Sequence, residues 1–178
     1  MPKNMANYLT IGRVLMIPVF LVLMYVDFPG SRYWALGVYI VACLTDFADG
    51  YIARHYNQIS DFGKFMDPLA DKCLVMAALC CFVEQGDMLA WILAVVLVRE
   101  FAVSGMRLIA VEKGRVIAAG WSGKIKTAST MVCICLIIAG IPQWANYVCQ
   151  AVILVTTVYS GVEYFVKNAD VFKSSEIK

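Results

Sequence analysis

Six long apolar stretches, separated by short polar segments, set the tightest limit on what this chain can fold into. A helix needs roughly 20 mostly apolar residues to cross the hydrocarbon of a bilayer, so a chain of 178 residues has room for about six spans and little else. With 61 % hydrophobic and 16 % charged residues, and a mean hydropathy of +0.73, the composition is more apolar than that of soluble domains. The sequence therefore predicts an all-α polytopic membrane protein with six transmembrane helices, in one domain over residues 1–178. The stretches are approximately Tyr8–Val26, Tyr33–Ala53, Leu69–Phe82, Met88–Val111, Thr127–Ile141 and Trp144–Val166.

The charges are distributed unequally between the two sets of loops. Turn-forming residues break the chain at Asp27–Ser31, Glu84–Asp87 and Gly140–Gln143, whereas the alternate loops are longer and charged. Of the 15 Lys and Arg residues, all except Arg32 lie in the charged loops, at the termini or at the flanking helix ends. Because cytosolic segments carry the excess of positive charge, both termini and both charged loops are expected in the cytosol. The first stretch has no small-residue cleavage site after it, which predicts a retained helix and not a signal peptide.

Seven cysteines lie within the apolar stretches, and Arg13 lies within the first of them. The cysteines show no Cys-x-x-Cys spacing, and we expect them to act as small hydrophobic residues, not as disulfides or zinc ligands. Arg13 interrupts the first stretch one to two turns from its start. A long side chain at that depth either reaches the head-group region as an anchor or belongs to an active site, and both interpretations stay open.

Four aspartates are the most informative residues in this apolar chain. Asp46 and Asp49 lie near the expected cytosolic end of the second stretch, and Asp67 and Asp71 open the third. Carboxylates at such positions are costly unless they are paired, solvated or bound to metal, which makes them candidates for function. In a helix, residues three or four apart share a face, so each pair should form one acidic stripe. Two facing stripes would make a pocket of four carboxylates.

The pocket predicts a divalent metal site. Like charges at close range oppose one another's ionisation, so four adjacent carboxylates require a compensating cation. Oxygen ligands suit Mg²⁺, Mn²⁺ or Ca²⁺, and the sequence has no His or Cys cluster suited to zinc. The small residues Gly50, Ala53 and Gly63 would leave room for a ligand against the backbone.

The same residues form an extended motif. The run Asp46-x-x-Asp49-Gly50-x-x-Ala53-Arg54 is followed, after eight residues, by Gly63-x-x-x-Asp67-x-x-x-Asp71. This run resembles the complete signature of the CDP-alcohol phosphotransferase family, and every signature position matches. Three further stretches resemble bacterial members of the family: Asn7–Arg13, Arg99–Arg107 and Gly123–Thr127.

The resemblance implies a fold, a reaction and a set of partners. The fold is the family's six-helix membrane fold, usually a homodimer, here in the inner (plasma) membrane of a bacterium. The likeness is greatest to members that use CDP-diacylglycerol and glycerol 3-phosphate and give phosphatidylglycerol phosphate and CMP. The cofactor would be Mg²⁺ or Mn²⁺, as two ions. The partners would be the two substrates, membrane lipid and a second copy of the chain, with no nucleic acid.

The resemblance also implies roles for single residues. Asp46, Asp49 and Asp67 would be the principal metal ligands, and Asp71 would contribute to a second metal and act as the catalytic general base. The cytidine diphosphate would be held by five residues: Asp49, Gly50, Ala53, Arg54 and Gly63.

The acceptor phosphate needs a second anion site, and basic residues on the fourth and fifth stretches supply candidates. Arg99 and Arg107 are eight residues apart, about 80° around a helix, so both could border one cavity. Lys124 and Lys126 lie at the expected start of the fifth helix, where the helix dipole also favours phosphate. The alternative for the two lysines is a purely topological role on the cytosolic side. Glu100 is expected to orient an arginine and not to bind substrate.

Two other functions deserve comparison. A cation or proton transporter would also place acids inside helices, but it would not require the small residues and the arginine of the motif at these spacings. A family member using phosphatidylglycerol, inositol phosphate or serine as acceptor is the stronger competitor, since the four aspartates do not distinguish acceptors.

Overall fold

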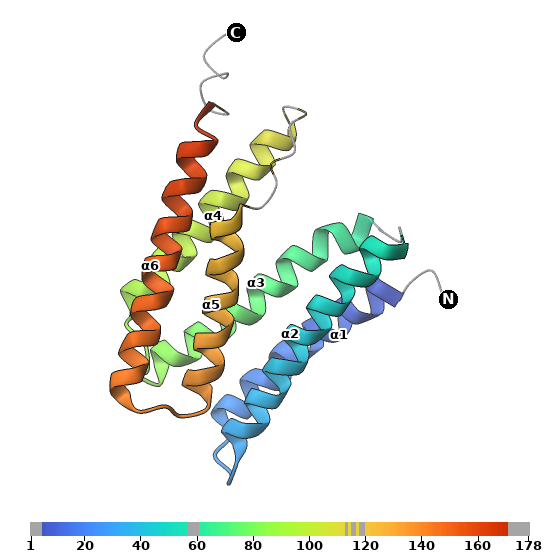
Figure 1. The fold of residues 1–178 in the computed structure, drawn as a ribbon. Coiled ribbons are helices and arrows are strands. Elements are labelled where there is room, and N and C mark those ends of the chain that lie inside the picture. The colour runs from blue at the N-terminus through green and yellow to red at the C-terminus, as the bar shows by residue number, and fades with distance from the viewer. Residues whose placement is uncertain (1–4, 57–60, 113, 115–116, 118–119, 171–178) are drawn as a thin grey trace. The chain divides into compact units, whose positions relative to one another are not determined.

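A computed structural model of the chain describes the backbone of residues 5–56, 61–112, 114, 117 and 120–170. Side chains are described for residues 12–45, 72–112, 114, 117 and 120–170. This part of the chain contains six helices and no strand (Figure 1). One helix coincides with each apolar stretch, which confirms the all-α class. The helices are α1 Met5–Tyr25, α2 Ser31–Tyr56, α3 Asp61–Glu84, α4 Ala90–Glu112, α5 Trp121–Ile138 and α6 Gln143–Lys167.

Two helices begin a full turn or more before their apolar stretches. Helix α3 begins at Asp61 and α5 at Trp121, whereas the apolar stretches begin at Leu69 and Thr127. Each of these helices includes polar residues before its apolar stretch, because polar side chains do not interrupt the backbone hydrogen bonds of a helix. The Lys124 N–H, for example, already donates to the Gly120 carbonyl oxygen at 3.3 Å. The acidic residues of the motif therefore lie inside α3 and do not open it.

The short loops before α2 and α6 contain turns, as the sequence predicts. Gly30, directly before α2, has a φ of 90°, and Gly140, before α6, has a φ of 79°. Side chains with a Cβ rarely adopt this left-handed region, so glycine is the favoured residue at both turns.

The helices group into two compact units, and each is described by itself. The first comprises Met1–Gln85 with Cys135–Ile141 and contains α1, α2 and α3. Helix α1 packs against both α2 and α3, and α2 packs against α3. At the α1–α2 contact, the buried rings of Phe20 and Tyr39 lie with their centroids 5.9 Å apart.

The second unit comprises Gly86–Ile134 with Pro142–Lys178. Helix α4 packs against α6, and the buried residues Val103, Met106 and Tyr164 form a cluster at this contact. Near the opposite end of α6, the side-chain amide nitrogens of Asn146 and Gln150 donate to the Asp87 carbonyl oxygen at 2.8 and 3.0 Å. Buried amides therefore fix the turn before α4 from within the unit.

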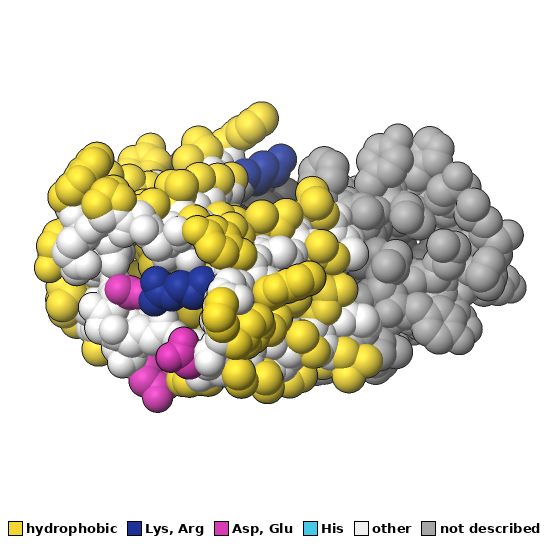
Figure 2. All heavy atoms as spheres, turned by 90° about the horizontal axis from the view of Figure 1, so that it is seen from below, with side chains coloured by type: hydrophobic (Ala, Val, Ile, Leu, Met, Phe, Trp, Pro, Cys, Tyr) yellow, Lys and Arg dark blue, Asp and Glu magenta, His cyan; other side chains and the backbone are white. Residues whose placement is uncertain are grey.

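The outer surface is strongly hydrophobic. Large apolar side chains stand exposed on several helices, for example Trp34 at 66 %, Phe101 at 73 % and Val166 at 72 %. Figure 2 shows hydrophobic side chains over much of the described part of one face, with few charges. Exposed apolar surface on this scale indicates contact with a membrane or with another protein.

Length and apolarity identify two helices as able to cross a membrane among the described residues. These are α5 and α6, and Gly12–Tyr25 of α1 is a shorter apolar helix. Helix α4 carries Arg99, Glu100 and Arg107 within its 23 residues, which lowers its hydropathy. The count of six spans therefore stays a prediction.

Candidate functional site

The motif aspartates lie on two helices that pack together. Asp46 and Asp49 are in α2, and Asp67 and Asp71 are in α3. The spacings of three and four residues put each pair on one helical face. All four side chains lie outside the described residues, as do those of the candidate nucleotide-binding residues Gly50, Ala53, Arg54 and Gly63.

The donor set of these helices fits a hard divalent cation. Both pairs are aspartates, so their donors are carboxylate oxygens, which Mg²⁺ and Mn²⁺ prefer. Within the described side chains, no group of three or more His, Cys, Asp or Glu residues could hold a metal ion. The motif pairs on α2 and α3 remain the candidate metal centre.

A buried ionic cluster joins α4 to α5 in the second unit. One carboxylate oxygen of Glu100, Oε1, accepts from Arg99 Nη1 at 2.7 Å and from Lys126 Nζ at 2.6 Å. Glu100 is 9 % exposed and Lys126 is 4 % exposed, so little water reaches these charges. Glu100 contacts an arginine, as expected, and it also binds a lysine from the next helix.

Two glycines lie beside the Arg99 side chain. A Cβ added to Gly161 of α6 would come within 3.2 Å of Arg99 Cγ, and one added to Gly123 of α5 within 3.8 Å of Arg99 Nη2. The first distance is tighter than an ordinary carbon–carbon contact. Glycine at position 161 therefore lets the arginine stem pass close to α6.

Arg107 has a different environment. Its side chain is exposed, and its Nε donates to the phenol oxygen of Tyr164 at 3.2 Å. The guanidinium carbon also lies 5.5 Å from the centroid of the Tyr164 ring. This distance is within the range of a cation–π contact.

Lys124 lies on the exposed side of α5. Its ammonium nitrogen lies 4.9 Å from the centroid of the exposed Trp121 ring. Among the candidate acceptor-binding residues, the structure therefore brings Arg99 and Lys126 together on Glu100. Arg107 and Lys124 contact aromatic rings of α6 and α5 instead.

Arg13 is buried in the first unit, with 1 % of its surface exposed. An anchor that reaches the head-group region would expose its charged end. The structure favours the second of the two interpretations left open for this residue, and its role at an active site stays a prediction.

All seven cysteines are free thiols. Cys81, Cys133 and Cys149 are buried, and Cys73 and Cys80 are exposed on the apolar surface of α3.

Comparisons with known proteins add evidence that is independent of these contacts. A family model described as CDP-alcohol phosphatidyltransferase matches residues 3–161. The chain is 37 % identical to "CDP-diacylglycerol--glycerol-3-phosphate 3-phosphatidyltransferase" of Bacillus subtilis (strain 168), with 97 % of this chain and 98 % of the relative covered. It is 38 % identical to a "Probable phosphatidylglycerophosphate synthase" of Mycobacterium tuberculosis (strain ATCC 25618 / H37Rv), with 90 % and 79 % covered. It is 34 % identical to a protein of Shigella flexneri serotype 5b (strain 8401) with the same name as the Bacillus relative, with 92 % and 94 % covered.

Proposed function

Because the chain belongs to the CDP-alcohol phosphatidyltransferase family, we propose that it is a phosphatidylglycerophosphate synthase. It transfers the phosphatidyl group of CDP-diacylglycerol to glycerol 3-phosphate, giving phosphatidylglycerol phosphate and CMP in phospholipid biosynthesis. The observation that carries this proposal is that 97 % of the chain is similar to a relative named for this reaction. The complete aspartate motif on α2 and α3 supports the same chemistry.

The motif residues would do the chemistry. Asp46, Asp49 and Asp67 would hold divalent metal, Mg²⁺ or Mn²⁺, with Asp71 contributing to a second ion. When bound, such a pair of ions neutralises the diphosphate and the leaving phosphate. Asp71 takes the proton of the acceptor hydroxyl as the general base. The oxygen of that hydroxyl attacks the phosphorus that carries diacylglycerol, and the bond from that phosphorus to CMP breaks.

The nucleotide would lie on the chain, and the lipid tails would lie outside it. Gly50, Ala53 and Gly63 would admit the cytidine diphosphate against the backbone, with Asp49 and Arg54 beside it. The diacyl tails would stay in the surrounding lipid, which explains why this chemistry is carried out by a membrane protein.

The acceptor phosphate would lie among the basic residues of α4 and α5. Of the four candidates, Arg107 and Lys124 are exposed, whereas the charges of Arg99 and Lys126 face the Glu100 carboxylate. These contacts favour Arg107 and Lys124 as direct phosphate ligands. Arg99 and Lys126 would then supply the positive border of the site.

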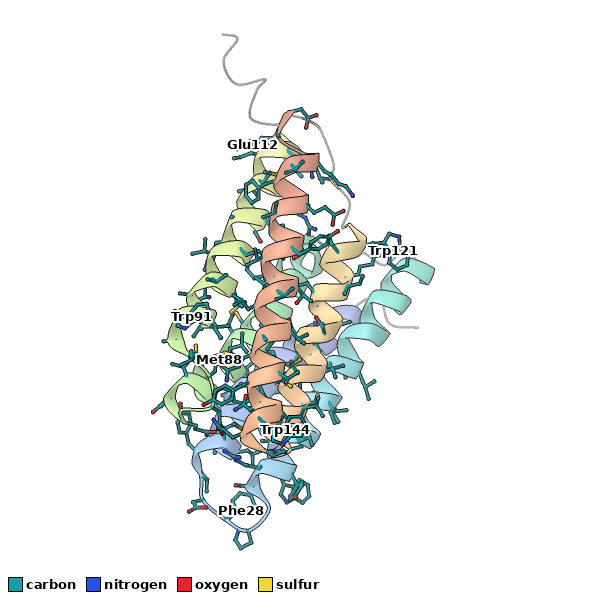
Figure 3. All side chains as sticks on the ribbon, turned by 60° about the vertical axis from the view of Figure 1, so that its left-hand side comes forward. Phe28, Met88, Trp91, Glu112, Trp121 and Trp144 are labelled. Carbon is teal, nitrogen blue, oxygen red and sulfur yellow. The ribbon has the colours of Figure 1, made fainter. Side chains whose placement is uncertain are left out.

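We also propose six membrane spans in a single domain, with both termini and the active site in the cytosol of a bacterium. Exposed tryptophans support this topology, since tryptophan is enriched at membrane–water interfaces. Trp34, Trp91 and Trp144 lie near the first residues of α2, α4 and α6, and Trp121 begins α5, which would run from the opposite side. Figure 3 shows Trp144 toward one end of the second unit and Trp121 nearer the other. A homodimer is part of the same proposal, and the exposed apolar surface offers area for it.

The identity of the acceptor is the point that most needs an experiment. The purified chain in mixed micelles would be given labelled CDP-diacylglycerol and Mg²⁺, with one acceptor at a time. We expect lipid product with glycerol 3-phosphate and only background with phosphatidylglycerol, inositol phosphate or serine. Faster product formation with any of the other three would assign the chain to that acceptor.

A further inference from the structure

Tyr164 of α6 is held rigidly beside Arg107 of α4. Its side chain is 8 % exposed and belongs to the buried cluster with Val103 and Met106, and Phe165 packs against this cluster. The phenol oxygen accepts the Arg107 Nε–H at 3.2 Å, and the ring centroid lies 5.5 Å from the guanidinium carbon. Because packing fixes the ring, two contacts from a fixed partner restrict the orientation of the guanidinium.

The hydrogen bond to Tyr164 engages one donor of the Arg107 guanidinium, Nε. A guanidinium has five N–H donors, and the terminal nitrogens form the fork that matches two oxygens of a phosphate. Tyr164 engages Nε, so both terminal nitrogens of Arg107 keep their donors. Among residues 72–112 and 120–170, neither terminal nitrogen takes part in a hydrogen bond or an ion pair.

Arg107 differs in this respect from the other arginine of α4. Arg99 gives one terminal nitrogen to the Glu100 carboxylate at 2.7 Å, so its charge is partly compensated inside the protein. Arg107 has a phenol and an aromatic face as partners, which orient the cation without neutralising it. A cation that is oriented but not neutralised is suited to an anionic ligand from outside the chain.

We propose that Tyr164 is a positioning residue, which orients the Arg107 guanidinium toward the phosphate of the acceptor. The inference rests on the proposed function, since it needs an acceptor that carries a phosphate. An arginine that is oriented before the ligand arrives loses less rotamer freedom on binding. Removing the phenol oxygen should therefore weaken acceptor binding by about 3- to 10-fold, the range expected for immobilising one long side chain.

The direct test is Tyr164→Phe, which keeps the ring in the cluster and removes the hydrogen-bond acceptor. We expect KM for glycerol 3-phosphate to rise about 3- to 10-fold, with kcat and the KM for CDP-diacylglycerol changed little. The matched control is Tyr159→Phe on the same helix, where the side chain is 66 % exposed, and it should keep wild-type constants. A change confined to stability, or an equal rise of both KM values, would indicate a structural role and overturn the inference.

A second variant approaches the contact from the arginine. Arg107→Lys keeps the charge but has no Nε–H, so it should also raise KM for glycerol 3-phosphate. Adding Tyr164→Phe to Arg107→Lys should then have little further effect, whereas independent roles would make the two changes multiply. If the two effects on KM for glycerol 3-phosphate multiply, the coupling between Tyr164 and Arg107 is refuted, even if Tyr164→Phe alone is poorly folded.

Arg107→Ala separates this inference from the proposal on which it rests. We expect this variant to raise KM for glycerol 3-phosphate at least tenfold, an order of magnitude consistent with the loss of a charge-assisted contact. If it does so and Tyr164→Phe has no effect, the acceptor site stands and the positioning role is wrong. If Arg107→Ala has no effect, both the assignment of Arg107 to the acceptor and the role of Tyr164 fail.

Discussion

Replacing Glu100 by glutamine should strongly destabilise the second helical unit. The carboxylate oxygen Oε1 accepts from Lys126 Nζ at 2.6 Å and from Arg99 Nη1 at 2.7 Å. Glutamine keeps the shape and one acceptor oxygen but removes the negative charge. Lys126, at 4 % exposure, would then be a buried cation without this counter-charge.

The size of the effect follows from the two bonds and the burial. A hydrogen bond to a charged group contributes about 1.5 to 3 kcal/mol and a neutral one about 0.5 to 1.5 kcal/mol. In the variant both donors stay charged and only the acceptor becomes neutral, so the two bonds together lose at most about 2 kcal/mol. The full cost of removing one partner from a buried ion pair is about 3 to 5 kcal/mol. We expect Glu100→Gln to lower the free energy of unfolding by roughly 2 to 4 kcal/mol, between these limits.

Equilibrium unfolding in mixed micelles, followed by circular dichroism, would measure the change. The control is Glu163→Gln in α6, which removes a carboxylate paired with the largely exposed Lys167 and should have a much smaller effect. Adding Lys126→Met to Glu100→Gln should recover part of the lost stability, because it removes the buried cation. Equal destabilisation by Glu100→Gln and Glu163→Gln would refute the reasoning from burial.

Three further predictions concern the metal, the base and the packing around Arg99. Excess EDTA should abolish turnover, and Asp67→Asn should lower both metal affinity and rate while leaving helix content unchanged; full activity in EDTA would contradict a metal-dependent reaction. Asp71→Asn should retain binding of CDP-diacylglycerol while kcat falls, which binding and turnover assays separate; near wild-type turnover would remove the general-base role. Gly161→Ala should lower the unfolding free energy because its Cβ would lie 3.2 Å from Arg99 Cγ. Gly37→Ala should not lower it, because a Cβ added to Gly37 meets no atom within 4 Å. Equal destabilisation by the two variants would exclude the close contact as the cause.

The helices were largely predictable because their signal is local. Each apolar stretch carries the information for one helix, and the turns at Gly30 and Gly140 follow from residues that tolerate positive φ. The first residues of α3 and α5 were not predictable from hydropathy, because a polar first turn looks like a loop when only apolar residues are counted. By length and apolarity, an uninterrupted helix such as α6 is able to cross a membrane, whereas α4 does not meet the same criterion because charges lie within the helix.

The candidate site follows from the sequence where its residues recur at fixed spacing, and it does not where it depends on packing between helices. The aspartates of α2 and α3 form a spaced motif, so their helices and relative faces follow from the sequence. The role proposed for Tyr164 has no such signal, since its contact with Arg107 spans 57 residues. The same holds for Gly161, whose closeness to Arg99 appears only when α6 lies against α4. A tyrosine and a glycine on a mostly apolar helix are otherwise typical of ordinary packing.

Positive residues on the cytosolic side of a membrane protein have two explanations, topology and anion binding, and the contacts distinguish them. A purely topological charge has no need of a fixed partner inside the protein, so Arg99 and Lys126, which are buried against Glu100, have at least a structural role. Lys124 lies over Trp121, whose ring is 77 % exposed at the start of α5, an environment typical of an interfacial anchor. Arg107 alone among these four combines an exposed charge with a buried, fixed partner. The acceptor phosphate should therefore depend more on Arg107 than on Lys124.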